Sequence, residues 1–146
     1  MDKEINNILL EVIGTQRIDG QKDKTELTTV GTIEHQDDCY IIKYSEQQDP
    51  PFAPIDVTVK ILKDESLVEM TRSGAYESRL IIEKSGRNLC HYGTEYGDIL
   101  MGIAGHSIET SYDGTNGRFS FRYDIDLNGA LASRNEVEMV FRNNQE

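Results

Sequence analysis

Residues 66–84, SLVEMTRSGAYESRLIIEK, contain two strand-like runs that fold back on each other. Apolar side chains occupy the even positions of both runs, for example Val68 in the first and Ile82 in the second. Because alternate residues of a strand face the same side, the two apolar faces coincide only if the connecting loop has an odd number of residues. We therefore predict an antiparallel hairpin with a three-residue loop, 73–75, in which Gly74 supplies unusual backbone dihedrals.

The same alternation of apolar and polar residues recurs along the chain. It is strict over residues 55–61 and 118–127 and returns over 137–141, as expected for antiparallel strands with one buried face. Turn sequences such as Asn128-Gly129 separate the strand-like segments. Less regular strands are expected over residues 4–18, 24–35, 38–46, 66–73, 76–84, 88–93 and 96–110, with a short helix over 4–13 as the alternative at the start.

Eight to ten strands joined by hairpin turns predict an all-β fold. A closed antiparallel up-and-down β-barrel is favoured over a sandwich, because closure removes the exposed edges that a long open sheet would have to protect. No linker, repeat or low-complexity tract divides the sequence, so we expect one domain over residues 1–146.

The chain carries 26 acidic and 15 basic side chains, which give a net charge of −11 and a pI of about 4.7. Such a negative field repels phosphate backbones and anionic lipid headgroups, so we expect no nucleic-acid partner and no membrane-surface role. No apolar run approaches the roughly 20 residues that span a bilayer, and Met-Asp-Lys-Glu-Ile at the start lacks the features of a secretory signal. We therefore expect a cytoplasmic protein, in which Cys39 and Cys90 stay reduced and buried.

On the predicted hairpin, Arg72 and Tyr76 lie opposite each other on the inward face, at one end of the barrel. A guanidinium there needs a partner, because burying an unpaired charge costs several kcal/mol. The functional interpretation is a ligand carboxylate or phosphate held in the arginine fork, and the structural one is an internal ion pair or a side chain that reaches the barrel rim. Tyr92 and Tyr123 could line the same cavity, or pack in the core with their hydroxyls at the surface. The candidate ligand-binding residues are therefore Arg72, Tyr76, Tyr92 and Tyr123.

The stretch Asp124-x-Asp126-x-Asn128-Gly129 matches the first half of a calcium-binding EF-hand loop. The twelfth position of such a loop should be a bidentate glutamate, but it is Asn135 here, and the segment that enters the loop is strand-like. We therefore interpret the stretch as the solvent face of a strand followed by a turn, and we predict no metal site.

No motif in the sequence assembles a catalytic group or a cofactor site. His35, His91 and His106 form no metal-ligand or nucleophile motif. Gly102 and Gly105 lie in an apolar run without the spacing of a phosphate-binding loop, so we expect them to mark a bulge or a bend. We predict neither enzyme activity nor a cofactor.

At residues 70–75, MTRSGA, and at residues 117–124, GRFSFRYD, the chain resembles the YwiB-like family. Tyr92 followed by residues 96–99, YGDI, is similar to the family as well, and the similarity is strongest from about residue 55 to residue 142. The family is a bacterial domain of unknown function with a calycin, or lipocalin-like, β-barrel fold. The resemblance implies a cytoplasmic protein with this barrel, and it brings no established catalytic residues.

Three functions are compatible with these observations. The leading hypothesis is a non-enzymatic module that binds a small anionic or amphipathic molecule in the barrel near Arg72. The alternative is an interaction or scaffold protein with a filled barrel, for which a homodimer is one option. A lipocalin-like enzyme that uses Arg72, a tyrosine and His91 or His106 is the third. A hollow interior would favour the first, and a packed interior the second.

Overall fold

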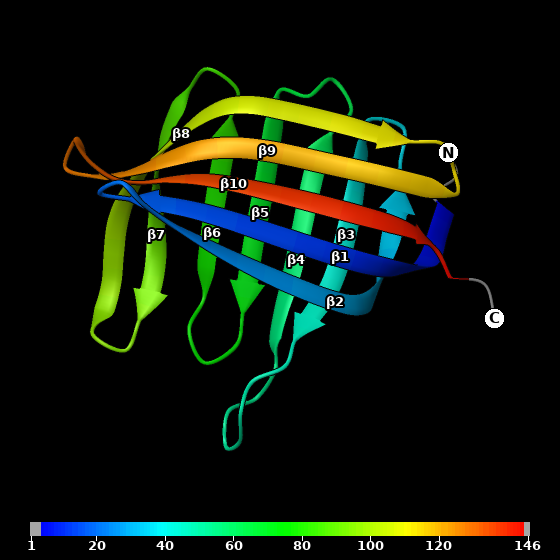
Figure 1. Cartoon of the computed structure of the whole chain (residues 1–146), viewed down its shortest axis with the longest axis horizontal. Helices are drawn as coiled ribbons and strands as arrows, with labels where there is room; N and C mark the ends of the chain where they lie inside the picture. The colour runs from blue at the N-terminus through cyan, green and yellow to red at the C-terminus, as the bar shows by residue number, and fades with distance from the viewer. Residues whose placement is uncertain (1–3, 145–146) are drawn as a thin grey trace.

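The computed structural model describes residues 4–144. Ten antiparallel strands follow one another: β1 (Glu4–Ile18), β2 (Gln21–His35), β3 (Cys39–Glu46), β4 (Ile55–Leu62), β5 (Leu67–Ser73), β6 (Ser78–Glu83), β7 (Arg87–Thr94), β8 (Gly97–Tyr112), β9 (Asn116–Leu127) and β10 (Ala130–Asn143). Each strand pairs with its neighbours in sequence, and β1 also pairs with β10, which closes the barrel (Figure 1). The predicted all-β, closed up-and-down barrel is confirmed. The alternative helix over residues 4–13 is wrong, because this segment is part of β1 and pairs with β2 and β10.

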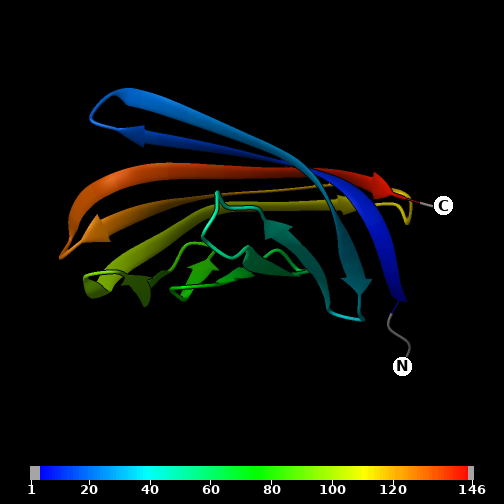
Figure 2. The ribbon, with the colours of Figure 1, turned by 90° about the horizontal axis from the view of Figure 1, so that it is seen from below.

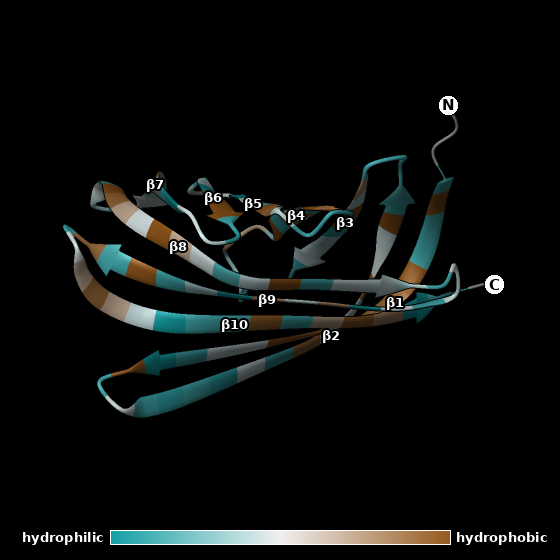
Figure 3. Cartoon of the chain, turned by 90° about the horizontal axis from the view of Figure 1, so that it is seen from above, coloured by the Kyte–Doolittle hydropathy of each residue, from teal (hydrophilic) through white to brown (hydrophobic). Residues whose placement is uncertain are grey.

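The barrel is flattened into two layers whose strands run in crossed directions. The strands β3 to β7 are short and form one layer, whereas β8, β9, β10, β1 and β2 are long and cross over it (Figures 1 and 2). Along its whole length, Gln21–His35, β2 pairs with β1, but it pairs with β3 only along Gly31–His35. The first half of β2 therefore extends past β3, and Figure 3 shows this segment as largely hydrophilic. The barrel is splayed open at this end.

Side chains from both layers fill the centre of the barrel. Phe119 and Phe121 of β9 are fully buried there, and they come from the strictly alternating segment of the sequence. The other large and fully buried side chains are Ile8, Leu10, Ile33, Ile42, Val57, Ile61, Ile82, Ile103, Ile108 and Met139. The centre is thus a packed hydrophobic core, so space for a ligand has to lie toward an end of the barrel.

The hairpin of β5 and β6 keeps the predicted parity but has a longer loop. The apolar faces of the two strands coincide, as an odd loop length requires, but the last paired residues are Arg72 and Ser78. Residues 73–77 therefore form a five-residue connection. The predicted three-residue loop is wrong, and so is the predicted position of Tyr76 opposite Arg72.

Two contacts explain the longer loop. The Gly93 N–H on β7 donates a hydrogen bond to the Glu77 carbonyl oxygen at 2.9 Å, which ties the loop to the neighbouring strand. Gly74 packs against Ile55, where an added Cβ would lie 3.3 Å from Ile55 Cγ1. The backbone of Gly74 is not among those with positive φ. The fold uses the small size of this glycine, so the prediction that it supplies unusual dihedrals is wrong.

The two glycines of β8 have different roles. Gly105 lies at a bulge, where the pairing with β9 shifts register between Gly105 and Ile108, so the predicted bulge is confirmed. Gly102 lies in a regular part of the ladder, where an added Cβ would collide with the side chains of Arg87 and Asp126. These two side chains form an ion pair that crosses β8 directly over the glycine.

The strands β6 and β7 are joined mainly at one end. Their register contains the pair Ser78 and Tyr92, which places the Tyr92 side chain beside Ser78. Farther along, the Ile81 N–H donates to Cys90 Sγ at 3.4 Å instead of to a backbone carbonyl. Cys39 and Cys90 are both free and buried. In the layer formed by β3 to β7, β6 and β7 are therefore paired near Tyr92, and their pairing is interrupted near Cys90.

Candidate binding site at the barrel mouth

Directly paired residues on six neighbouring strands place a row of side chains on the inner face of the barrel, near one end. From β3 to β8, the row consists of Tyr44, Val57, Arg72, Ser78, Tyr92 and Ile99. Side chains of directly paired residues point to the same face of a sheet, and Val57 is buried in the core. Arg72 therefore lies in the middle of an inward-facing row.

Glu46 at the end of β3 is the partner of Arg72. Its Oε2 accepts a hydrogen bond from Arg72 Nη1 at 3.0 Å, and its Oε1 accepts one from Nη2 at 2.5 Å. The two side chains are partly exposed, 30% for Arg72 and 24% for Glu46. Burial alone would lower the pKa of Arg72, but the hydrogen bonds and charge of Glu46 outweigh that effect and raise it above its usual value. From the sequence, Arg72 is expected either to hold a ligand anion or to serve the fold. The structure contains an internal ion pair, which agrees with the structural interpretation.

Two buried tyrosines lie near this ion pair. Burial raises the pKa of Tyr123 to about 12, with a smaller contribution from Tyr92, and the positive charge of Arg72 opposes the rise. Burial also raises the pKa of Tyr44 to about 12, where Glu46 adds to the rise and Arg72 again opposes it. Both phenol groups therefore stay protonated at neutral pH and remain hydrogen-bond donors.

A cavity of about 290 Å³ opens beside Arg72 at this end of the barrel. Phe52 and Ile55 from the segment around the start of β4, Tyr76 from the β5–β6 loop and Tyr92 from β7 give it aromatic and aliphatic walls. Arg72 is the charged residue of the lining. Phe52 is 66% and Tyr76 is 52% exposed, so the rim of the cavity is accessible from solvent. We refer to this cavity as the mouth cavity.

The structure brings three of the four candidate residues together. Arg72, Tyr76 and Tyr92 line the mouth cavity, although Tyr76 reaches it from the loop and not from the strand that the sequence predicts. Tyr123 is not part of the lining. It is 7% exposed and packs in the core against Phe121, with ring centroids 6.2 Å apart. Its position agrees with the core-packing interpretation.

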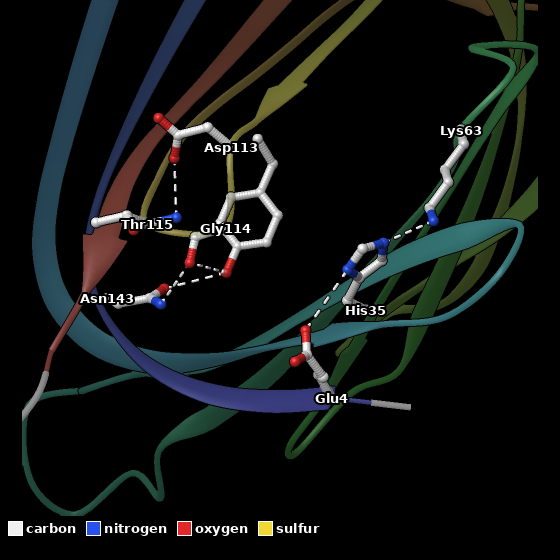
Figure 4. Close-up of polar contacts among 8 residues, drawn as sticks. Glu4, His35, Lys63, Asp113, Gly114, Thr115 and Asn143 are labelled. Carbon is white, nitrogen blue, oxygen red and sulfur yellow. Dashed lines mark hydrogen bonds and ion pairs between the residues drawn. The ribbon is translucent and has the colours of Figure 1, made fainter. Parts of the chain in front are cut away.

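The opposite end of β3 holds a polar cluster around His35 that the sequence analysis did not foresee. Lys63 Nζ donates to His35 Nε2 at 2.6 Å, and the other ring nitrogen, Nδ1, faces Glu4 Oε1 at 3.9 Å (Figure 4). The His35 ring also packs against Tyr40 and Tyr112, with centroids 5.1 and 6.2 Å away. Because both ring nitrogens have polar neighbours and the ring packs against two tyrosines, His35 has a structural role at this end.

The other two histidines lie on the outer surface of the barrel. His91 is exposed on β7, where the neighbouring Cys90 points inward. The Nε2 atom of His106 on β8 lies 3.0 Å from Asp124 Oδ2 on β9. Neither histidine lies on the inner face that carries Arg72.

The calcium-like stretch is the end of β9 followed by a turn, as predicted. Asp126 accepts hydrogen bonds from Arg87 Nε and Nη2 at 2.9 and 2.7 Å, and these bonds lower the pKa of Asp126 to about 2. Asn128 and Gly129 have φ values of 54° and 86°, which form the turn into β10. Within residues 4–144, no group of three or more His, Cys, Asp or Glu side chains is placed to hold a metal ion.

Comparisons with known proteins agree with this architecture. A search of curated proteins found no match. The crystal structure of the ywiB protein from Bacillus subtilis is similar, with a TM-score of 0.83 and 20% sequence identity over 97% of this chain and 94% of that one. At this identity the likeness shows the fold alone. This chain therefore has a YwiB-like barrel. In the part of the chain that the structure describes, no helix has the length and apolar character needed to cross a membrane. The profile of a domain of unknown function, DUF1934, matches residues 10–139, so the chain belongs to the DUF1934 family.

Proposed function

We propose that this protein is a non-enzymatic module that binds a small amphipathic molecule in the mouth cavity. The observation that carries the proposal is the meeting of two exposed aromatic side chains, Phe52 and Tyr76, with Arg72 in one cavity. Arg72 is held there by its ion pair with Glu46. Binding sites for small molecules combine apolar walls with a few well-placed polar groups. The cavity volume of about 290 Å³ is near the lower end of the range for such sites, so the ligand has to be small.

The ion pair determines which polar group the ligand carries. A simple carboxylate or phosphate would have to displace Glu46 from Arg72 and leave a partly buried carboxylate without its partner, which is costly. A hydroxyl or an amide, which both donates and accepts hydrogen bonds, can bind against the intact pair. Of the two ligand classes suggested by the sequence, we therefore favour an amphipathic molecule with an uncharged polar end over a plain anion.

The proposal of binding without catalysis rests on the separation of the titratable groups. General acid–base chemistry needs two such groups within hydrogen-bond reach in one pocket. His91 and His106 lie on the outer surface, and His35 lies at the opposite end of β3. None of them lines the mouth cavity with Arg72.

The proposed setting is the cytoplasm. Cys39 and Cys90 are free thiols, which suits a reducing compartment. The net charge of −11 disfavours nucleic acids and anionic membrane surfaces as partners.

A matched pair of probes, benzamide and benzoate, tests the proposed ligand class. The two have the same ring, but benzamide ends in an uncharged group that donates and accepts, and benzoate ends in an anion. We expect ligand-observed NMR to show saturable binding of benzamide that is stronger than that of benzoate. Phe52→Ala and Tyr76→Ala should weaken this binding, because both rings line the cavity.

The control for this experiment is Tyr96→Ala. Tyr96 is 91% exposed and does not line the cavity, so its replacement should leave benzamide binding unchanged. Failure of both probes to bind, or binding that Phe52→Ala leaves unaltered, would rule out the mouth cavity as the site.

Protein interaction is the second candidate function, and both the packed centre of the barrel and a group of exposed rings favour it. Phe52, Tyr76 and Tyr96 are 66%, 52% and 91% exposed. The loops that contain them, between β3 and β4, β5 and β6, and β7 and β8, lie at the same end of the barrel (Figure 1). Apolar side chains gathered on a surface often mark an interface. Light scattering over a range of concentrations tests for a homodimer. A dimer that Tyr96→Ala weakens would support this function, and a monomer at every concentration would count against it.

A further inference from the structure

We propose that the outer face of the barrel carries a second site, which binds a small anion with two or more negative charges. A groove of about 580 Å³ on this face is lined by Arg17 of β1, Arg122 of β9 and Arg134 of β10. Arg122 points away from the core, because Phe121 and Tyr123 on either side of it are buried. Arg17 and Arg134 are exposed and directly paired, so they share one face of the sheet. The groove is therefore separate from the mouth cavity.

The strand register sets two arginines of this groove directly opposite each other and places a lysine from outside the groove next to them. Arg17 is paired with Arg134 on one side and with Lys22 of β2 on the other. Like charges directly opposite each other on antiparallel strands destabilise a sheet. A row of three cations across three strands is therefore unfavourable by itself, and a bound anion would offset the repulsion.

The carboxylates of the groove leave its arginines without ion pairs. Asp124 lies opposite Arg134 in the register, but its Oδ2 atom lies 3.0 Å from His106 Nε2. Glu136 is the residue paired with Arg122 in the strand register, yet no ion pair joins them in the part of the chain that the structure describes. Three guanidinium groups thus face only two carboxylates, and one oxygen of Asp124 lies against His106.

The other arginines of the chain behave differently. Four of the eight form ion pairs with carboxylates: Arg72, Arg79, Arg87 and Arg118. Of the four that form none within residues 4–144, three line this groove, and the fourth, Arg142, lies farther along β10. Acidic residues outnumber basic ones 26 to 15, so partners are plentiful. A gathering of unpaired arginines in such an acidic chain points to a ligand that supplies the missing negative charge.

The arginine fork indicates the chemistry of that ligand. Guanidinium groups bind phosphate and carboxylate oxygens in a bidentate manner, and three of them suit a molecule with several such oxygens. The volume of the groove is that of a small-molecule site. A long polyanion such as a nucleic acid would also meet the net charge of −11 and be repelled. The ligand class is therefore a small phosphate ester or a polycarboxylate.

Calorimetric titration of the full chain with inorganic pyrophosphate and, separately, with citrate tests this site. We expect saturable binding of one equivalent that weakens as salt is added. Arg17→Gln and Arg134→Gln should each raise the Kd about tenfold or more, because each removes charged hydrogen bonds. Binding of pyrophosphate alone would assign the site to phosphates, and binding of both probes would extend it to polycarboxylates.

Arg142→Gln is the matched control. Arg142 is also an exposed arginine of β10 that forms no ion pair within residues 4–144, but it lies opposite Leu9 and Asn116 and not opposite a cation. Its replacement should leave the Kd unchanged. Absence of binding to both probes would overturn the proposal, and so would an equal loss of affinity in Arg142→Gln and Arg134→Gln.

The stability of the anion-free protein gives an independent readout. Removing a cation from the opposed row relieves repulsion, so the Tm of Arg134→Gln should equal that of the wild type or exceed it by about 1–3 °C. Added pyrophosphate should raise the Tm of the wild type more than that of the variant. A clear fall in the Tm of anion-free Arg134→Gln would contradict the proposal, because it would show that the arginine serves the fold.

Discussion

Replacing Arg72 by methionine measures what the ion pair at the barrel mouth contributes to stability. The change keeps a long side chain but removes both hydrogen bonds to Glu46. Loss of one partner of a fully buried ion pair costs about 3–5 kcal/mol, and hydrogen bonds to charged groups contribute about 1.5–3 kcal/mol. Because 30% of Arg72 and 24% of Glu46 are exposed, water compensates part of the loss. We expect Arg72→Met to lower the free energy of unfolding by about 1–2 kcal/mol.

A double-mutant cycle isolates the interaction itself. Glu46→Gln alone leaves Arg72 without its counter-charge, whereas Arg72→Met combined with Glu46→Gln leaves neither charge behind. We expect the double variant to lose less stability than the two single variants together, with a coupling energy of about 1 kcal/mol or more. Urea unfolding of all four proteins, followed by circular dichroism, measures these free energies.

Arg79→Met is the control for this cycle. Arg79 also pairs with a carboxylate, that of Glu69, but its side chain is 66% exposed, so its loss should cost less than about 1 kcal/mol. Two results would refute the reasoning about Arg72. If the stability losses of the two single variants add up to that of the double variant, Arg72 and Glu46 do not act as a pair. A more stable Arg72→Met would show that the arginine is kept for a ligand at a cost to the fold.

Three further changes test packing and ionisation in the barrel. Gly117→Ala places a methyl group in the Phe141 ring, so we expect urea unfolding to show a loss of about 1–3 kcal/mol. The pKa of Tyr123 rises from 10 to about 12 on folding, so its contribution to stability is present below pH 10 and is lost as the pH rises to 12. Alkaline unfolding should therefore shift to higher pH in Tyr123→Phe. Gly102→Ala should displace the arginine that pairs with Asp126, and NMR titration should then show the Asp126 pKa rising from about 2 toward its usual value.

Each of these changes has an outcome that contradicts its physical basis. Unaltered stability of Gly117→Ala would mean that the Phe141 ring can move without cost. An unchanged alkaline transition in Tyr123→Phe would show that another group controls unfolding at high pH. An unchanged Asp126 pKa in Gly102→Ala would show that the ion pair does not depend on close approach over that glycine.

The fold could be predicted because the alternation of buried and exposed residues is a local property of each strand. In β9, Phe119 and Phe121 are buried while Arg118 and Arg122 are exposed, as their parity predicts. The ends of strands were harder to predict. The alternation predicts a strand over 137–141 where the structure has β10 over Ala130–Asn143. The inward positions in the first part of β10 are polar, Ser133 and Asn135, and the Asn135 side-chain amide donates a hydrogen bond to the Ser133 hydroxyl, so no apolar pattern marks them.

The site could be predicted only in part, for a related reason. Arg72 is recognisable in the sequence because a charge continues the apolar face of β5. Glu46 follows the inward-facing Tyr44 by two residues, so its parity also places it inside. Its contact with Arg72 depends on which strands are neighbours and in which register, and parity alone does not give either. Tyr76 reaches the mouth cavity through a loop whose length is set by contacts with other strands.

Replacing an arginine is expected to have opposite effects on stability at the mouth cavity and in the outer groove. This contrast distinguishes a structural arginine from a ligand-binding one within a single protein. Arg72 is paired with Glu46, so its removal should destabilise the free protein. Arg134 lies opposite Arg17 on one side, and Asp124 on its other side lies against His106, so removal of Arg134 should not destabilise the protein. Residues kept for binding commonly carry a cost to the fold, which is recovered when the ligand is bound. If Arg72→Met is destabilising while Arg134→Gln is neutral or stabilising, the outer groove is the stronger candidate for anion binding. The mouth cavity would then be left to uncharged amphipathic ligands.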